Sequence, residues 1–307
     1  MSSVARYAPS HTSDTERPDP RYADIDLWPT GSVLAALAES QMVAVAVAHA
    51  ALPDIEAVVE AAIPRLRKGG RMFYVGAGTS GRVGMQDGVE LTPTFGMPVE
   101  RLVLLLAGGL DAVSQAVEGA EDDEEAARAE VLSFVPDEND VVIGVAASGS
   151  TPYTCAALAT ARECGSLTVG VSGNLKGRVL HEAEFGIRLP TGPEVVSGST
   201  RLKAGTAQKV ALNMLSTTIM IRLGHVYRGQ MVDMKVTNAK LGKRAARMVK
   251  MLAGGTDAEI EAALKRAGGN VKRAVLARAG VAAEAIEDLL DRHQGDLRKA
   301  LAAVGWR

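Results

Sequence analysis

The sequence reads Val75-Gly76-Ala77-Gly78-Thr79-Ser80-Gly81-Arg82 at the end of an apolar run that begins at Arg71. The run is typical of a buried strand, and the apolar spacing from Val83 to Glu90 predicts a helix. Glycine permits positive φ and a close approach of backbone to ligand, and a helix N-terminus offers free N–H groups and a positive dipole end. We therefore expect Gly78, Thr79 and Ser80 to bind the phosphate of a small molecule.

The composition is that of a soluble globular protein, whose 307 residues suffice for one large domain or two smaller ones. Hydrophobic residues make up 47% of the chain, and the net charge of −2 gives no reason to expect a nucleic acid or a membrane as partner. Cys155 and Cys164 are nine residues apart in one predicted helix, so they point to opposite faces and cannot pair. We expect reduced thiols in a cytoplasmic protein.

Residues 1–29 are polar and contain several prolines, with no apolar signal-peptide core. We expect an extended arm that is able to wrap around a partner subunit. The following segment, Ser32–Leu52, is apolar enough to raise the question of a membrane span. Glu39, Gln41 and His49 interrupt it, so we expect a buried helix instead.

Residues 30–253 alternate between apolar, β-rich runs and helical segments, which is typical of a parallel sheet covered on both faces. The expected fold is a doubly wound α/β domain, in which ligands bind beyond the C-terminal ends of the strands. Residues 254–307 follow a change in composition and predict a small helical domain, similar to a ubiquitin-associated bundle, without evident chemistry. The predicted strands are Met72–Val75, Arg101–Leu106, Val141–Ala146, Leu167–Val171 and Phe185–Leu189, and the predicted helices of the larger domain span residues 31–50, 53–68, 80–90, 110–118, 123–133, 151–163, 201–222 and 239–252.

A second hydroxyl-rich loop, Ala147-Ser148-Gly149-Ser150-Thr151-Pro152, follows the predicted strand Val141–Ala146. Pro152 suits a first helical turn and Thr151 an N-cap, so one reading is that Ser150 and Thr151 merely cap a helix. Two such loops at the ends of parallel strands favour a shared ligand, bound by Ser148, Ser150 and Thr151.

A third candidate loop, Ser197–Thr200, precedes a long apolar helix. Ser199 and Thr200 would add hydroxyl groups to the same ligand site. Lys203, in the first turn of that helix, is either a counter-charge for the phosphate or a solvated surface lysine.

Two carboxylates would supply an acid and a base beside a bound sugar phosphate. Glu90 ends the helix predicted after the first loop, where the helix dipole disfavours an acid, and this hints at function. Residues 118–125 form an acidic cluster, in which we expect solvated charges at a helix N-terminus and room for one carboxylate to turn inward. The histidines are unpersuasive as bases, and no spacing of His, Cys and Asp predicts a metal site.

Six sequence blocks point together to one known family. The chain resembles the N-acetylmuramic acid 6-phosphate etherases, which have the sugar isomerase (SIS) fold, from about residue 30 to its C-terminus. The resemblance implies a lyase of peptidoglycan recycling that cleaves the D-lactyl ether of its substrate to N-acetylglucosamine 6-phosphate and D-lactate. The blocks are Gly76-Ala77-Gly78-Thr79-Ser80-Gly81-Arg82, Pro93-Thr94-Phe95-Gly96, Ala107-Gly108-Gly109, Val117-Glu118-Gly119-Ala120-Glu121-Asp122-Asp123, Ala146-Ala147-Ser148-Gly149 and Lys203-Ala204-Gly205-Thr206-Ala207-Gln208-Lys209.

The resemblance also assigns roles to two residues. It makes Glu90 the acid that protonates the departing lactate and Glu121 the base that removes the C2 proton. It further implies a homodimer that needs neither a metal nor another cofactor, with a sugar phosphate as its ligand. Which subunit completes each site stays open, and so does the question whether Glu118 or Asp122 shares the base role.

The chain departs from the family pattern beside Glu90, where Leu91-Thr92 replaces the usual Cys-Pro. This departure leaves the fine substrate preference open. The same fold also contains aldose–ketose isomerases and non-catalytic sugar-phosphate sensors, and these are the alternative functions. The presence of both Glu90 and Glu121 favours the enzyme.

Overall fold

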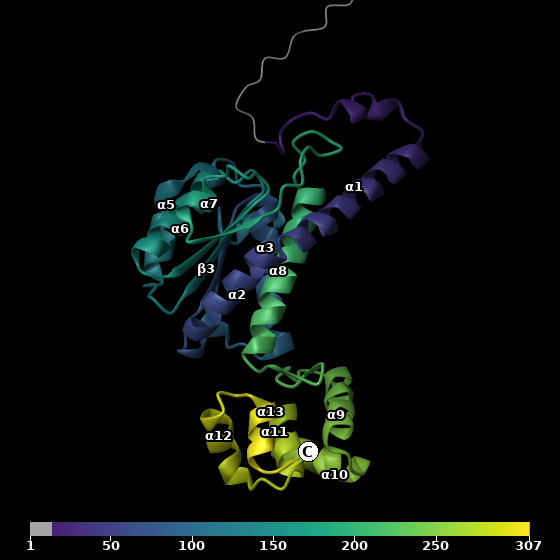
Figure 1. Cartoon of the computed structure of the whole chain (residues 1–307), viewed down its shortest axis with the longest axis vertical. Helices are drawn as coiled ribbons and strands as arrows, with labels where there is room; N and C mark the ends of the chain where they lie inside the picture. The colour runs from purple at the N-terminus through teal and green to yellow at the C-terminus, as the bar shows by residue number, and fades with distance from the viewer. Residues whose placement is uncertain (1–13, 307) are drawn as a thin grey trace, which may run out of the picture.

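The computed structural model describes residues 14–306, and it confirms the expected α/β class (Figure 1). Residues 1–13 of the expected arm lie outside the described residues. Five strands pair in parallel in the order β2-β1-β3-β4-β5, at positions that match the predicted ones. They are β1 (Met72–Gly76), β2 (Leu102–Leu106), β3 (Val141–Ala146), β4 (Leu167–Ser172) and β5 (Phe185–Arg188).

Alternate side chains of β1, β2 and β3 enter two different hydrophobic cores, one on each face of the sheet. Met72 and Tyr74 of β1 belong to one core, and Phe73 and Val75 belong to the other. This period of two explains why the strands read as continuous apolar runs. Figure 1 shows the two helical layers. The first core is covered by α1 (Thr30–Ala50), α2 (Leu52–Arg67), α3 (Gly78–Phe95) and α8 (Lys203–Arg222), and the second by α5 (Glu124–Ser133), α6 (Pro152–Glu163) and α7 (Val179–Glu182).

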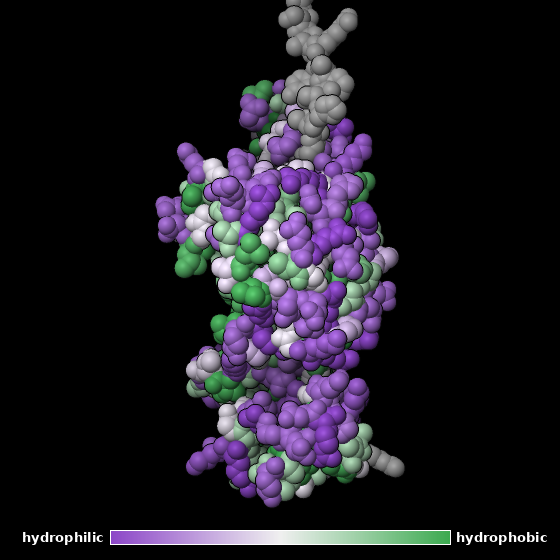
Figure 2. Space-filling model, turned by 90° about the vertical axis from the view of Figure 1, so that its left-hand side faces the viewer, coloured by the Kyte–Doolittle hydropathy of each residue, from purple (hydrophilic) through white to green (hydrophobic). Residues whose placement is uncertain are grey.

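Short elements complete the sheet domain. The 3-10 turns are η1 (Pro20–Tyr22), η2 (Ile25–Leu27), η3 (Val99–Arg101) and η4 (Ala120–Asp122), and α4 (Asp111–Ser114) is much shorter than the predicted helix 110–118. The outer face, over α5, α6 and α7, is mainly hydrophilic, with apolar side chains in small separate groups (Figure 2).

Helix α1 is less buried than the sequence predicts. Its buried positions form a single stripe of small residues, Ala36, Ser40, Ala44 and Ala48, against the sheet domain. Leu34 is 62% exposed and Met42 is 66% exposed. By length and composition α1 could cross a membrane, and 22% of its most apolar window is buried in this chain. The expectation of a buried helix is therefore wrong for this chain, because only one narrow stripe of α1 is covered and the rest of its largely apolar surface is open.

Helix α3 is longer than predicted, because it continues past Glu90 to Phe95 with Pro93 inside its last turn. It ends at Gly96, whose φ of 70° lets its N–H bond back to the carbonyl groups of Leu91 and Thr92. Glu90 therefore lies inside the helix, and the expectation that it occupies an unfavourable C-terminal position is wrong.

The C-terminal domain contains five helices and a hydrophobic core of its own (Figure 1). This core begins at Tyr227 and includes Val249 and Leu252 of α9, so α9 packs with the C-terminal helices and not with the sheet. The packing boundary thus lies before α9, whereas we expected it at residue 254. The hairpin β6 (Val226–Tyr227) and β7 (Gln230–Met231) leads into α9 (Ala239–Ala253), α10 (Asp257–Arg266), α11 (Val271–Arg278), α12 (Ala283–Arg292) and α13 (Leu297–Ala303).

A partly buried carboxylate connects the linking segment to the C-terminal helices. Asp233 accepts hydrogen bonds from Nδ1 of His225, at 2.9 Å, and from Nζ of Lys272, which is buried. Burial opposes ionisation of Asp233, but the hydrogen bond from His225 and the positive charge of Lys272 outweigh it and lower the pKa of the carboxyl group.

Replacement of Asp233 tests the contribution of these hydrogen bonds to stability. We expect Asp233→Asn to lower the free energy of unfolding by about 3 kcal/mol, because Lys272 would be left buried without its counter-charge. The control is Asp257→Asn, which removes an exposed ion pair to Lys250 and should cost much less stability than Asp233→Asn. Chemical denaturation at pH 7 measures both variants, and equal losses would contradict the account. Because the folded pKa of Asp233 is lowered, its contribution in the wild type should fade as pH falls through that pKa.

Candidate active site

The turn after β1 is closed by two glycines in direct backbone contact. A Cβ atom on Gly76 would lie 2.7 Å from Cα of Gly81, and one on Gly81 would lie 2.4 Å from Cδ1 of Leu106. No side chain fits at either position, so only glycine lets α3 start this close to the sheet. The spacing of Gly76, Gly78 and Gly81 is that of dinucleotide-binding turns, where glycines serve the same packing purpose.

The turn after β3 lies directly beside the first one. Gly149 adopts a φ of 77°, and a Cβ atom there would lie 2.3 Å from Oγ of Ser172 and 2.6 Å from Cα of Gly177. The backbone N–H of Ala147 donates to Oγ of Ser80 at 3.3 Å, which joins the two turns. Strand order reverses between β1 and β3, and ligands of open α/β sheets bind at such a switch point.

The two turns open into a cavity of about 520 Å³. Helices α3 and α6 both start at it, and their N-cap residues, Ala77 and Thr151, form no side-chain capping hydrogen bond. The N–H groups of both first turns are therefore available to an anion, and Thr151 is not a helix cap in the usual sense. Predicted binding residues that line the cavity are Gly78, Thr79, Ser80, Ser148, Ser150, Thr151 and Thr200.

The residues of the acidic cluster make different contacts. Asp123 accepts from the N–H of Ala126 at 2.8 Å and caps α5, while Glu124 pairs with Arg128 and Arg178. Glu121 and Asp122, which are both exposed in turn η4, line the cavity instead. The turn follows Gly119, whose φ of 73° directs the chain away from the preceding segment. Glu118 lines a neighbouring cavity of about 390 Å³ together with Glu121.

Glu90 is not brought to this cavity. It lies twelve residues after Gly78 on the same helix, which places it about 18 Å along the helix axis from the first turn. Its side chain is exposed, whereas Asp87, one turn earlier, is buried and accepts a hydrogen bond from the Tyr74 hydroxyl at 2.7 Å. Burial, followed by the negative charge of Asp87, raises the pKa of Tyr74. A single chain therefore presents Glu121 and Glu90 at separate places.

Ser199 and Lys203 do not line the cavity either. The ammonium group of Lys203 donates to the carbonyl of Pro193, and burial lowers the pKa of this lysine. Glu194, which sequence reasoning missed, is fully buried and accepts from the N–H groups of Lys203, at 3.2 Å, and Ala204, at 2.9 Å. It caps α8, and its burial raises the pKa of its carboxyl group.

Sequence reasoning also missed Glu16, which comes from the N-terminal segment and lines the cavity. No local pattern signals it, because the segment is polar and lacks any period. Among the described lining residues there is no Lys or Arg, so the anion would be held by N–H and hydroxyl donors. The cavity thus combines an anion site with the carboxylates of Glu16, Glu121 and Asp122.

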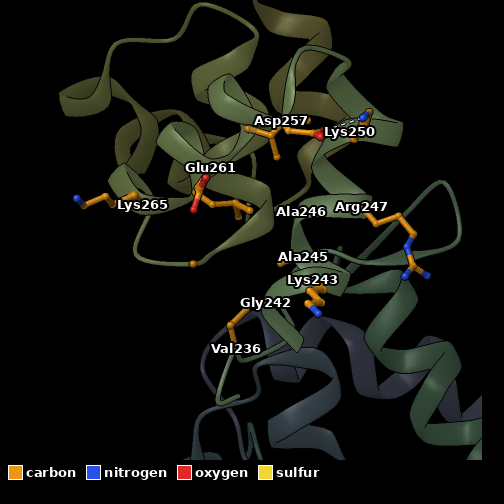
Figure 3. A pocket seen from close by; sticks show the side chains of 13 residues that line it. Val236, Gly242, Lys243, Ala245, Ala246, Arg247, Lys250, Asp257, Glu261 and Lys265 are labelled. Atoms are coloured by element: carbon orange, nitrogen blue, oxygen red, sulfur yellow. Dashed lines mark hydrogen bonds and ion pairs between the residues drawn. The ribbon is translucent and has the colours of Figure 1, made fainter. Parts of the chain in front are cut away.

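A larger cavity, of about 770 Å³, lies between α9 and α10 in the C-terminal domain (Figure 3). Its lining includes the apolar residues Ala245, Ile260 and Leu264. Lys243 and Arg247 also line it and are labelled in Figure 3. None of its described lining residues carries a hydroxyl group. This groove has no part in the anion site at the sheet.

Comparison with known proteins identifies the family. A protein from Deinococcus radiodurans named N-acetylmuramic acid 6-phosphate etherase is 48% identical over 288 residues, which cover 94% of each chain. The chain belongs to the N-acetylmuramic acid 6-phosphate etherase family. A protein of the same name from Salmonella typhimurium is 45% identical over 94% of this chain and 97% of its own. Both alignments are longer than the part of the chain after residue 30, so the etherase resemblance reaches into the N-terminal segment.

Two further comparisons concern the sheet domain of this etherase family member. Residues 54–162 match the glucokinase regulatory protein N-terminal SIS domain. A solved phosphoheptose isomerase from Francisella tularensis is 18% identical, with a TM-score of 0.49, and covers 63% of this chain and 100% of its own.

Two glycine substitutions test the geometry of the anion site. Both Gly78 and Gly149 have positive φ, but a Cβ atom on Gly78 meets nothing within 4 Å, whereas one on Gly149 collides with the Ser172 and Gly177 segment. We expect Gly149→Ala to lower the free energy of unfolding by more than about 2 kcal/mol and Gly78→Ala by about 1 kcal/mol. Thermal denaturation compares them, and a Gly78→Ala loss as large as that of Gly149→Ala would contradict the described packing.

Proposed function

We propose that this protein is an N-acetylmuramic acid 6-phosphate etherase, which releases D-lactate and forms N-acetylglucosamine 6-phosphate. The observation that carries the proposal is a cavity that joins two uncapped helix N-termini to the carboxylate of Glu121, in a chain of the etherase family. The reaction belongs to peptidoglycan recycling. Its substrate is charged and does not cross a bilayer unaided, which supports a cytoplasmic site of action.

The phosphate group anchors the substrate in the cavity. The first-turn N–H groups of α3 and α6, with the hydroxyls of Thr79, Ser80 and Ser148, would bind its oxygens. Neutral donors at two helix ends hold the anion without a lysine or arginine that could neutralise the nearby carboxylates. The bound phosphate then fixes the sugar carbons relative to Glu121, which lowers the entropic part of the activation barrier of the reaction.

Glu121 acts as the base. Once the sugar ring is open, the C1 aldehyde acidifies the C2 proton, and the Glu121 carboxylate removes it. The electron pair moves into the C1–C2 enolate and then forms the C2–C3 double bond as the C3–O bond to lactate breaks. Water adds to C3 of this unsaturated aldehyde, and C2 takes back a proton.

Glu90 supplies the proton that leaves with the lactate oxygen, and we place it in a second copy of the chain. The distance of about 18 Å along the α3 axis between Glu90 and the first turn at the cavity supports this placement. The apolar open face of α1, with Leu34 and Met42, supports a homodimer, since such a surface is costly to leave in water. The proposal requires that a partner seated there place its own Glu90 at the cavity.

The activity itself is tested with N-acetylmuramic acid 6-phosphate in heavy-oxygen water. We expect release of D-lactate without label and one heavy oxygen at C3 of the product sugar, because elimination breaks the C3–O bond and water restores it. Mass spectrometry of both products measures this outcome. Formation of a ketose phosphate without lactate would instead indicate an isomerase, and binding without any turnover would indicate a sensor.

The assignment of Glu90 to the partner is tested by mixing two inactive variants. We expect Glu90→Gln and Glu121→Gln each to lower kcat at least 100-fold. In a mixed dimer, one site would combine Glu121 of the first chain with the partner's Glu90, so activity should return to about a quarter of the wild-type value after random exchange of subunits. If mixing restores no activity while mass spectrometry shows that mixed dimers have formed, both glutamates act from one chain.

A further inference from the structure

The N-terminal segment is held at the rim of the active-site cavity. Thr15 is fully buried, and a Cβ atom on Gly173 would lie 3.3 Å from its Cγ2 atom, so Thr15 fills the space beside the β4 end. The carbonyl of Glu16 accepts a hydrogen bond from Oγ of Ser197 at 3.2 Å. The segment is therefore fixed to the third hydroxyl loop, which precedes α8.

The side chain of Glu16 lies against a position that only glycine suits. Gly198 has a φ of 73°, and a Cβ atom on it would lie 2.9 Å from Oε2 of Glu16. The carboxylate thus passes over the bare backbone of this loop and reaches the cavity that Thr200 and Glu121 line. The carboxylate is exposed, so a ligand in the cavity can contact it.

The carboxylate of Glu16 has no cation of its own in the described part of the chain. Arg17 approaches Asp14 at 3.8 Å, and Arg21 pairs with Asp19 at 2.6 Å. The two arginines that are nearest to Glu16 in the sequence thus form ion pairs with other acids. An uncompensated carboxylate in a cavity repels phosphate but accepts hydrogen bonds from hydroxyl and amide N–H groups.

We infer that Glu16 is a specificity-determining residue that binds the sugar portion of the substrate. With the phosphate at the turns of α3 and α6, the Glu16 carboxylate accepts a hydrogen bond from a sugar hydroxyl or from the acetamido N–H group. This inference rests on the proposed function, because it takes an amino-sugar phosphate as the ligand. Glu16 therefore selects ligands with a donor at this point, and it offers no favourable contact to phosphate alone.

The test compares two ligands on matched variants by titration calorimetry. Glu16→Gln keeps the shape and removes the charge, and Asp24→Asn removes an exposed carboxylate of the same segment that does not line the cavity. For Glu16→Gln we expect the Kd of N-acetylglucosamine 6-phosphate to rise about 10-fold or more, since a hydrogen bond to a charged group is lost. The Kd of inorganic phosphate should not rise, because no contact to phosphate is lost and a negative charge that repels the anion is removed. Asp24→Asn should change neither Kd.

Two outcomes would overturn the inference. An unchanged Kd for the sugar phosphate in Glu16→Gln would exclude the contact, and an equal weakening of both ligands would mean that Glu16 only holds the loops in place.

The proposed function fails separately: a wild-type protein that binds the sugar phosphate through Glu16 but releases no lactate would overturn the etherase activity alone. In the lactate assay the same variant should raise KM about 10-fold and keep kcat within about 3-fold.

Discussion

The backbone contact between Gly76 and Gly81 sets the position of everything at the active site. Because neither residue has a side chain, the start of α3 lies against the end of β1, and the Ser80 hydroxyl reaches the backbone of the β3 turn at Ala147. Two helix N-termini then face one cavity without capping side chains. A methyl group at either glycine would separate the helix from the sheet and remove the anion site.

The kinds of group that line the candidate site bear on its chemistry. The donors that we propose for the phosphate are N–H and hydroxyl groups, while three carboxylates from two places in the sequence line the same cavity. This arrangement suits chemistry in which one carboxylate removes a proton and another supplies one, since no lysine or arginine lines the described part of the cavity to hold both ionised. In the mechanism that we propose, the single chain is incomplete, because Glu90 lies on α3 about 18 Å along the helix axis from the first turn.

Much of this could be predicted from the sequence, and the failures have physical causes. The strands and both hydroxyl turns were predictable because apolar runs and glycine patterns are local signals. The end of α3 was not, because Pro93 reads as a breaker, yet in the last turn it interrupts little of the hydrogen bonding. The separation of Glu90 from Glu121, and the return of Glu16 to the cavity, depend on tertiary packing that no local pattern records.

The most direct test of the central claim is a crystal structure of the protein with bound N-acetylglucosamine 6-phosphate. The account predicts phosphate oxygens within hydrogen-bonding distance of the backbone N–H groups at the start of α3 and α6, with C2 of the sugar beside Glu121. A phosphate bound elsewhere, for example in the basic-sided groove between α9 and α10, would contradict it.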